Sequence, residues 1–463
     1  MPFTMQAHTK MQEDDMSRAR QLGVSDAALS ASRRIMVEPR DILAMGDSTL
    51  RVLQWNVLAD GLSGDGFLVQ DVLESPGETD KLEAVLSAMD EVKRSGGDMF
   101  ALKARLETPR ASKNHAAIVD WTRRWRQIKR VLADAQPDVI TFQEMDHMAD
   151  AMRELAELGY QSGLPNAQYV PAHTAGIAKG DVHAYVAHLE RVRVAFAADL
   201  PSTSRKLALR TNPDADDNGC AIFWRAATIA AEHIDFLPIG GARCCAAVRA
   251  RLRRRSDGTT FYVLCTHLKS GDGSEEEATR LSQLGSPSDG TLSLTDWLAQ
   301  SMASRPTLLC LDANSSPERT EKQTVWRLLR ATPNIASVWD SAFDSSGRAI
   351  CAPQPVSTNK IRGPLSDQPA KIGHHAYALI DHIYFSRHFA FIRHACSPLA
   401  YSSRKEARMH LIPSLDMPSD HAPVIVDLTL PLAWRVGRVG RWFALAGAIL
   451  IVGVSIQIAR RVS

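Results

Sequence analysis

Carboxylate, amide and imidazole side chains recur in this sequence at the ends of short apolar segments. Together such groups can hold a divalent cation and move protons, as hydrolysis of a phosphoester requires. A single Asp or Asn at a strand end is more often a turn residue or a helix cap. Recurrence along the whole chain instead favours one shared site, because strand ends of an α/β sheet border a ligand crevice. The expected members of the site are Asn56, Glu144, His267, Asp312, Asn314, Asp381, Asp420 and His421.

The elements that must position these residues are short strands separated by helices and long loops. Residues 50–58 alternate apolar and polar positions like a half-buried strand. Residues 121–133 carry apolar side chains at helical spacing, and Pro137 then introduces the apolar run 139–142. Mixed strands and helices predict an α/β sandwich. Further strands are expected at 221–224, 261–266, 307–311, 380–385 and 424–430.

Composition places the protein among ordinary folded chains. Of its 463 residues 45% are hydrophobic and 23% charged, which is typical of globular proteins. The formal net charge is only +2, so an anionic ligand must be attracted locally rather than by the whole surface. The seven cysteines include no CxxC pair, which favours a reducing compartment. The first 20 residues lack a continuous apolar core and do not resemble a secretory signal.

The two ends of the chain differ from its middle. The first 48 residues are polar, and residues 61–114 are rich in Gly, Ser and charge around one helical pattern. We expect a flexible segment at 1–48, a catalytic domain at 49–431 with a surface insertion at 61–114, a basic linker at 432–441 and a candidate transmembrane anchor at 442–459.

The anchor prediction rests on an uncharged run bracketed by arginines. Residues 442–459 contain only Ser455 and Gln457 as polar interruptions. As a helix the run would extend about 27 Å, against roughly 30 Å for a typical hydrocarbon core. The alternative is a buried terminal helix, which normally shows one polar stripe. A single span here would leave the catalytic domain in the cytosol, at the endoplasmic reticulum or the mitochondrial outer membrane.

Several strings of the sequence resemble the exonuclease, endonuclease and phosphatase superfamily, and within it the branch of nocturnin and the cytoplasmic deadenylases. They occur in family order over about residues 50–430. The matching strings are LQWNVLADGL, WTRRWRQIKRVLADAQPDVITFQEMDH, NGCAIFW, CTHLKS, LCLDANSSP, STNKIRG, IDHIYFSRH and LIPSLDMPSDHAPV. The resemblance implies an α/β fold (α+β in some schemes), a four-layer sandwich of two packed mixed β-sheets flanked by helices, with one crevice at the strand ends.

The residue types agree with the metal-dependent chemistry that the resemblance implies. Mg²⁺, with Mn²⁺ as an alternative, prefers carboxylate and carbonyl oxygens and water. Glu144 and the amide of Asn56 offer such ligands, and Asp420 is expected near the same ion. The alternative for Glu144 and for Asp312 is a surface carboxylate or a helix cap.

The remaining residues are assigned to the phosphoryl group and the attacking water. Asp312 is expected to orient and deprotonate the water, while Asn314 binds a phosphate oxygen. His267 and His421 are expected to donate to the phosphate or to the leaving oxygen, and Asp381 to hold His421 in one tautomer. The alternatives are buried histidines with satisfied hydrogen bonds and, for Asp381, a cap at the strand entrance.

Substrate contacts are expected from Lys360 and Arg362 in STNKIRG, from Lys269 in CTHLKS and from Asn218. The three basic side chains could equally be solvated surface residues. Asn218 stands where the family usually has Asp, directly before the Gly of the GCAIF strand, which affects base or ribose contacts.

The predicted substrate is a phosphorylated nucleotide such as NADP with its 2′-phosphate, or an RNA 3′ end such as poly(A). Aromatic residues are only 6% of the chain, whereas a processive RNA enzyme needs stacking surfaces along a basic track. This favours a nucleotide phosphatase or a short-RNA exonuclease over a processive deadenylase. The chain has no leucine-rich repeat for docking, and no protein partner is predicted. The alternatives are a catalytically inactive, membrane-tethered nucleotide-binding protein and a lipid phosphodiesterase of the same superfamily.

Overall fold

The computed structural model describes residues 49–60, 67–68, 117–162, 169–171, 219–239, 245–285, 293–362 and 373–429, with isolated positions between 17 and 38 and between 87 and 95. Asn218, the linker 432–441, the candidate anchor 442–459 and most of the insertion 61–114 lie outside the described residues. Within the described part of the chain no helix is long and apolar enough to cross a membrane.

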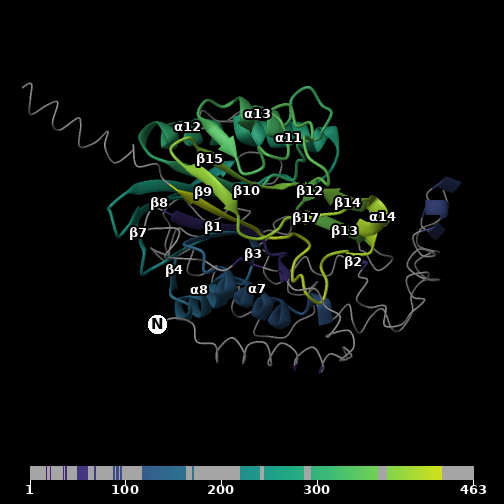
Figure 1. Ribbon diagram of the computed structural model, residues 1–463, viewed down its shortest axis with the longest axis horizontal. Coiled ribbons are helices and arrows are strands. Elements are labelled where there is room, and N and C mark those ends of the chain that lie inside the picture. Colours follow the sequence, from purple (N-terminus) through teal and green to yellow (C-terminus); the bar gives the residue numbers. More distant parts are fainter. Residues whose placement is uncertain are drawn as a thin grey trace, which may run out of the picture.

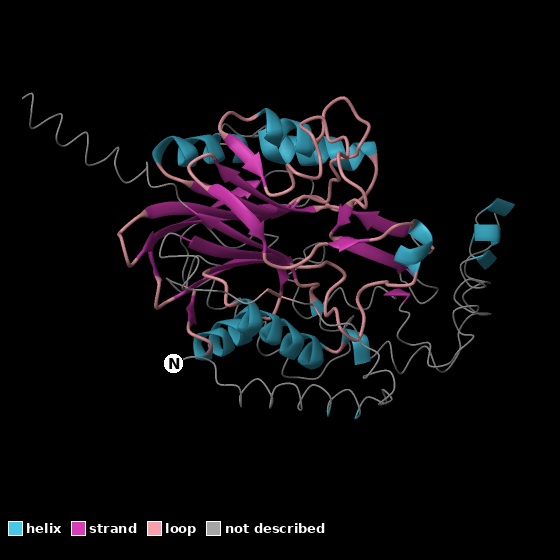
Figure 2. Ribbon diagram, viewed as in Figure 1, coloured by secondary structure: helices cyan, strands magenta, loops and turns pink. Residues whose placement is uncertain are grey.

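Two β-sheets pack face to face in the middle of the domain (Figures 1 and 2). The first sheet has the order β16-β18-β1-β3-β6-β4, with β5 paired to β6. Its strands are β1 Thr49–Asn56, β3 Val139–Met145, β4 Tyr160–Gln161, β5 Tyr169–Pro171, β6 Gly219–Arg225, β16 Ala390–His394 and β18 Val424–Thr429. The second sheet has the order β11-β15-β10-β9-β8-β7. Its strands are β7 Ile229–Ile239, β8 Cys245–Arg254, β9 Thr260–His267, β10 Thr307–Asp312, β11 Ile335–Ser337 and β15 Asp381–Ser386.

Helices cover both outer faces, which gives the four layers expected from the sequence. Figure 1 shows α7 (Trp121–Ala135) and α8 (Met148–Glu157) beside the first sheet. The second sheet is covered by α11 (Ser274–Gly285), α12 (Leu294–Ser304) and α13 (Val325–Ala331). Smaller pieces lie at one end: the pair β12 (Pro355–Val356) and β17 (Leu399–Ala400), the sheet β14-β13-β2 (His375–Ala378, Thr358–Arg362 and Phe67–Leu68) and helix α14 (Arg404–Arg408). The predicted α/β sandwich is confirmed.

Alternate side chains of β1 point to opposite faces of the sheet, so this one strand contributes to two hydrophobic cores. Leu50 and Val52 pack into the cluster between the sheets, whereas Leu53 and Trp55 pack with the helices α7 and α8. Successive side chains of a strand point to opposite faces. Gln54 and Asn56 continue the series of Leu50 and Val52, so their polar side chains face the opposite sheet.

Strand direction collects the expected site residues at one end of the sandwich. β1 runs parallel to β3, and β9 runs parallel to β10, so their carboxyl ends lie together. β15 and β18 run antiparallel to their neighbours, so their first residues reach the same end. Residues that follow some strands and precede others are therefore brought together.

A buried arginine anchors the opposite end of the first sheet. Arg51 Nε and Nη2 donate to the two carboxylate oxygens of Asp427 at 2.7 and 3.0 Å, and Nη1 donates to the Ala135 carbonyl at 3.0 Å. Arg393 Nε also donates to Asp427, at 2.9 Å. Arg51 and Asp427 are both completely buried. This pair ties β1 to β18 and to the end of α7.

We predict that Asp427→Asn lowers the free energy of unfolding by about 3–5 kcal/mol, because it leaves the Arg51 charge buried without its carboxylate. Chemical denaturation monitored by circular dichroism measures the change. The control is Asp150→Asn, which removes the half-buried partner of the exposed Arg153 and should cost less than about 1 kcal/mol. Equal effects of the two substitutions would contradict the prediction.

Candidate active site

Three site residues stand in a row across the second sheet. Asp312, the last residue of β10, pairs with His267 at the end of β9 and with Asp381 at the start of β15. Asp312 and Asp381 are buried, and the His267 side chain is 21% exposed. The strand register alone therefore brings together residues separated by more than a hundred positions in the chain.

Residues of the first sheet reach across to this row. Asn56 Nδ2 donates to Asp312 Oδ2 at 2.9 Å, and Gln54 Nε2 donates to Asp381 Oδ1, also at 2.9 Å. All four side chains are buried. These two hydrogen bonds join the sheets at the end where the site lies. Sequence reasoning missed Gln54, although its place two residues before Asn56 in an alternating strand was a usable signal.

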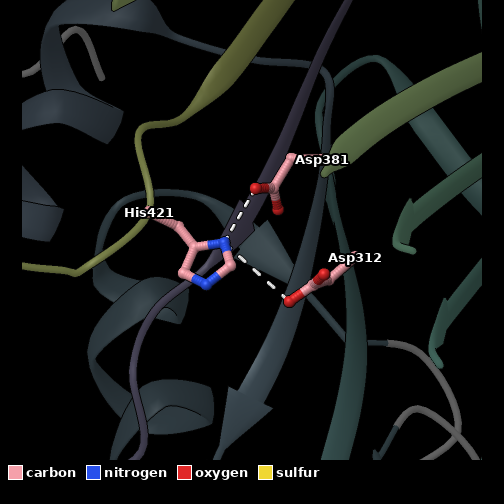
Figure 3. Close-up of side chains that lie close together, drawn as sticks. All are labelled: Asp312, Asp381 and His421. Atoms are coloured by element: carbon pink, nitrogen blue, oxygen red, sulfur yellow. Dashed lines mark hydrogen bonds and ion pairs between the residues drawn. The ribbon is translucent and has the colours of Figure 1, made fainter. Parts of the chain in front are cut away.

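His421 is held between two carboxylates, as Figure 3 shows. Its Nδ1 lies 2.7 Å from Asp381 Oδ2 and 3.8 Å from Asp312 Oδ2. Its backbone is fixed as well, because its N–H donates to Ser419 Oγ and its carbonyl accepts from Trp55 Nε1. The predicted contact between Asp381 and His421 is present, and it engages Nδ1, while Nε2 lies 3.9 Å from Asp420 Oδ2.

Electrostatics favours the charged form of this histidine. Burial alone would lower the pKa of His421, but the carboxylates of Asp381, Asp420 and Asp312 outweigh burial and raise it to about 9. Burial likewise opposes ionisation of Asp381, but His421 draws the pKa of that carboxyl below its usual value. At neutral pH the pair is an imidazolium with a carboxylate, so Nε2 presents a proton.

Asn314 and His267 form the other side of Asp312. The Asn314 backbone N–H donates to Asp312 Oδ1 at 2.9 Å, and Asn314 Nδ2 lies 2.8 Å from His267 Nε2. His267 Nε2 is also 3.3 Å from Asp312 Oδ2. Asn314 adopts a φ of 48°, a conformation that costs energy for a residue with a side chain. The hydrogen bond from the Asn314 backbone N–H to the Asp312 carboxylate helps to hold Asn314 in this conformation.

Glu144 lies in β3, next to the end of β1. Gln143 pairs with Asn56, and the Gln143 carbonyl accepts from Val57 N–H at 3.1 Å. Glu144 Oε2 accepts from Ala59 N–H at 3.2 Å, and Asn56 Oδ1 accepts from Leu58 N–H at 3.0 Å. The turn after β1 thus orients both expected metal ligands.

Asp420 and Lys360 form a partly buried ion pair through Asp420 Oδ2 and Lys360 Nζ. Burial opposes the charged form of Lys360, but Asp420 raises its pKa above the usual value. Asp420 Oδ2 is also 3.9 Å from His421 Nε2. An expected metal residue and an expected substrate residue therefore meet beside the histidine, a contact that sequence reasoning did not foresee.

Two other basic residues that were expected to contact the substrate, Arg362 and Lys269, have different surroundings. Arg362 is two residues beyond Lys360 on β13, and its guanidinium carbon lies 5.5 Å from the centre of the Phe67 ring. Phe67 belongs to the insertion and pairs with Arg362 through β2. Lys269 follows β9, and its Nζ donates to the Ser270 carbonyl at 2.8 Å rather than to a site residue. Asn218 is outside the described residues.

Residues 53–421 match the model of the endonuclease/exonuclease/phosphatase family. The chain belongs to this family. Its members are generally hydrolases that act on phosphoester bonds, and they generally use divalent metals. No curated protein matches the sequence at a significant level.

Solved structures of the endonuclease/exonuclease/phosphatase type resemble the chain over most of its length. The human nocturnin catalytic domain with bound sulfate is 19% identical, with a TM-score of 0.45, over 83% of this chain and 94% of that one. ANGEL2, a 2′,3′-cyclic phosphatase in complex with adenosine-2′,3′-vanadate, is 14% identical, with a TM-score of 0.46, over 82% and 96%. Truncated TDP2 from Caenorhabditis elegans is 14% identical, with a TM-score of 0.40, over 83% and 99%.

Two groups of side chains at this site could be considered for a cation. Ligand atoms of Asp312, Asp381 and His421 all lie within 4.8 Å of one another. However, Asp381 Oδ2 and His421 Nδ1 already share a hydrogen bond, so this trio is better suited to holding a proton. Glu144 and the amide oxygen of Asn56, which accept hydrogen bonds from the turn after β1, are hard oxygen donors of the kind that Mg²⁺ or Mn²⁺ prefers. The residues present therefore fit such an ion.

We predict that Asp381→Asn lowers kcat for phosphoester hydrolysis about 10²–10⁴-fold with little change in KM, because the neutral amide no longer stabilises the His421 imidazolium. Steady-state kinetics measures this. Asp235→Asn serves as the control, since Asp235 pairs with Arg249 in the β7–β8 hairpin rather than with a site residue. An unchanged kcat in Asp381→Asn would show that this contact is only structural.

Proposed function

We propose that the protein is a metal-dependent phosphoester hydrolase acting on a phosphorylated nucleotide or an RNA 3′ end. The observation that carries the proposal is the convergence of Asp312, His421, Asn314 and His267 at one end of the sandwich, joined to Asn56 across the sheets. In this proposal the Asp312 carboxylate accepts a proton, and the imidazoles of His421 and His267 donate to a single phosphoryl group.

Each side chain has a distinct task in the proposed reaction. Asp312 orients the attacking water and accepts its proton, with its carboxylate fixed by the Asn56 amide and the Asn314 backbone. His421 Nε2 and His267 donate to the phosphoryl oxygens or to the leaving oxygen, and the Asn314 amide binds a phosphoryl oxygen. Glu144 and Asn56, with Asp420 nearby, would hold the ion, Mg²⁺ or Mn²⁺. When bound, the ion lowers the pKa of water and neutralises charge on the phosphoryl group.

The cations of β13 serve the substrate in this proposal. Lys360 and Arg362 project from alternate positions of one strand, so they lie on the same face. Lys360 is held beside His421 by Asp420, where an ammonium group can meet a phosphate. Lys269 and Asn218 are proposed as more peripheral substrate contacts.

The basic cluster of β8 supports a small substrate over a long RNA. Arg249 donates to Asp235 at 2.6 Å, and Arg254 donates to Asp257 at 2.7 Å. Arg251 and Arg253 share Glu232. The acidic partners reduce the charge available to a nucleic-acid backbone. We therefore favour a nucleotide such as NADP or a short RNA, as the nocturnin-like strings also suggest.

The substrate is decided by assaying the full chain in detergent with Mg²⁺ against NADP, oligo(A), RNA ending in a 2′,3′-cyclic phosphate and sphingomyelin in mixed detergent micelles. We expect turnover of NADP or of short RNA and loss of that turnover in Glu144→Ala. Turnover of sphingomyelin alone would indicate a lipid phosphodiesterase. Binding of a nucleotide without any turnover would indicate an inactive binding protein.

We propose that residues 442–459 attach the protein to a membrane, with the catalytic domain in the cytosol. The uncharged run bracketed by arginines supports this. Thr429 at the end of β18 pairs with Thr49 at the start of β1, whereas the site lies at the other end of β1. An anchor following β18 would leave the site free.

We expect the full chain to stay with membranes after carbonate extraction and to be digested by protease added from the cytosolic side. A variant that ends at residue 441 provides the control and should be released. Release of the full chain would reject the anchor.

A further inference from the structure

A second buried arginine, Arg124 on α7, lies directly behind the site. Its side chain is completely buried, and its guanidinium carbon is 5.3 Å from the centre of the Trp121 ring. Trp121 in turn stacks on His147, with ring centres 4.2 Å apart. Completely buried arginines are rare in proteins unless their charge and hydrogen bonds are satisfied. The partners of Arg124 therefore indicate what it does.

Arg124 joins two segments that are distant in the sequence. Its Nη2 donates to the Val57 carbonyl at 2.6 Å and also to the Leu58 carbonyl, in the turn after β1. Its Nε donates to the Pro418 carbonyl at 2.7 Å, in the loop before β18. The rigid planar fork of a guanidinium suits such a bridge, which a lysine could not reproduce.

Both bridged segments contain or directly contact the expected ligands of the ion. The turn begins after Asn56 and continues to Ala59, whose N–H binds the Glu144 carboxylate. Leu58 within it has a φ of 56°, a conformation that needs external support. The loop continues from Pro418 to Ser419, whose hydroxyl donates to the Asn56 carbonyl at 2.7 Å, and then to Asp420.

The charge of Arg124 also faces the site. Burial lowers the pKa of Arg124, and the carboxylates of Asp60, Asp146, Asp420 and Glu144 oppose this shift. Arg124 remains protonated in spite of its burial, because arginine does not lose its proton in proteins. A fixed cation behind several carboxylates reduces their mutual repulsion before an ion binds.

We propose that Arg124 is a positioning residue of the active site, fixing Asn56, Glu144 and Asp420 relative to one another by clamping the turn after β1 to the loop before β18. The proposal rests on the proposed function for the presence of a divalent ion. It does not depend on which phosphoester is hydrolysed.

Arg123 offers a matched control on the same helix. It is equally buried, and its Nη2 donates to the Leu415 carbonyl, in the same loop but three residues before Pro418. Replacing either arginine by methionine removes a buried charge while keeping most of the side-chain volume. The Arg124 variant releases the turn that follows Asn56, whereas the hydrogen bond from Arg123 to the Leu415 carbonyl lies before Pro418.

The test is Mn²⁺ affinity, measured by electron paramagnetic resonance on the full chain and on Arg124→Met, Arg124→Lys and Arg123→Met, with thermal unfolding of each. We expect both Arg124 variants to bind Mn²⁺ about 10-fold or more weakly, as for other residues that orient metal ligands. Arg123→Met should lose comparable stability and keep its Mn²⁺ affinity. Lysine at position 124 should not restore the Mn²⁺ affinity, because it keeps the positive charge but lacks the planar guanidinium group.

Three results would overturn the proposal. Equal loss of affinity in Arg123→Met would mean that only general stability matters. If Arg124→Lys bound Mn²⁺ with wild-type affinity and Arg124→Met bound it more tightly, the charge of Arg124 would matter rather than its positioning of the ligands. If the unmodified chain bound no Mn²⁺, the proposed metal-dependent function would be wrong. If the chain bound Mn²⁺ but hydrolysed no substrate, the effect of Arg124 on Mn²⁺ affinity could still be measured.

Discussion

The site depends on hydrogen bonds between polar side chains that are buried where two sheets face each other. Asn56 and Gln54 of one sheet bind Asp312 and Asp381 of the other, and each would carry a large desolvation cost without its partner. Because the partners come from opposite sheets, the sandwich must close in one register to satisfy them. The requirement that stabilises this end of the domain also places the proposed acid, the proposed base and the proposed metal ligands together.

Charge is balanced at this end by pairing within a confined volume. Asp381 is matched by His421, and Asp420 by Lys360, while Arg124 lies behind the group and Arg51 with Asp427 secures the far end of the sheet. Unpaired buried charges are far more costly than paired ones. The resulting network keeps ionised groups in place at neutral pH. Backbone conformations with positive φ at Leu58, Glu144 and Asn314 occur at the same place, as is common where side chains are held for chemistry.

Much of this arrangement could be predicted from local patterns. The strand at 50–58 corresponds to β1, the helix at 121–133 to α7, and the site residues at strand ends follow from alternation and from family-like strings. Contacts between distant segments could not be predicted in the same way. Gln54 looks like any polar position of a half-buried strand, and nothing in the sequence around Asp420 indicates Lys360 as its partner. Arg124 and Arg123 are adjacent and alike in sequence, and only the tertiary structure shows that they bind different parts of the loop before β18.

We propose that residues from both sheets surround one divalent ion and one phosphoryl group. A crystal structure with Mn²⁺ and inorganic phosphate, with the ion located by its anomalous signal, tests it most directly. We expect one Mn²⁺ bound by Glu144 and Asn56 Oδ1, with a phosphate oxygen within hydrogen-bond distance of His421 Nε2, His267 or Asn314. An ion bound between Asp381 and His421 in place of their hydrogen bond, or Glu144 turned away from both ion and phosphate, would contradict the account.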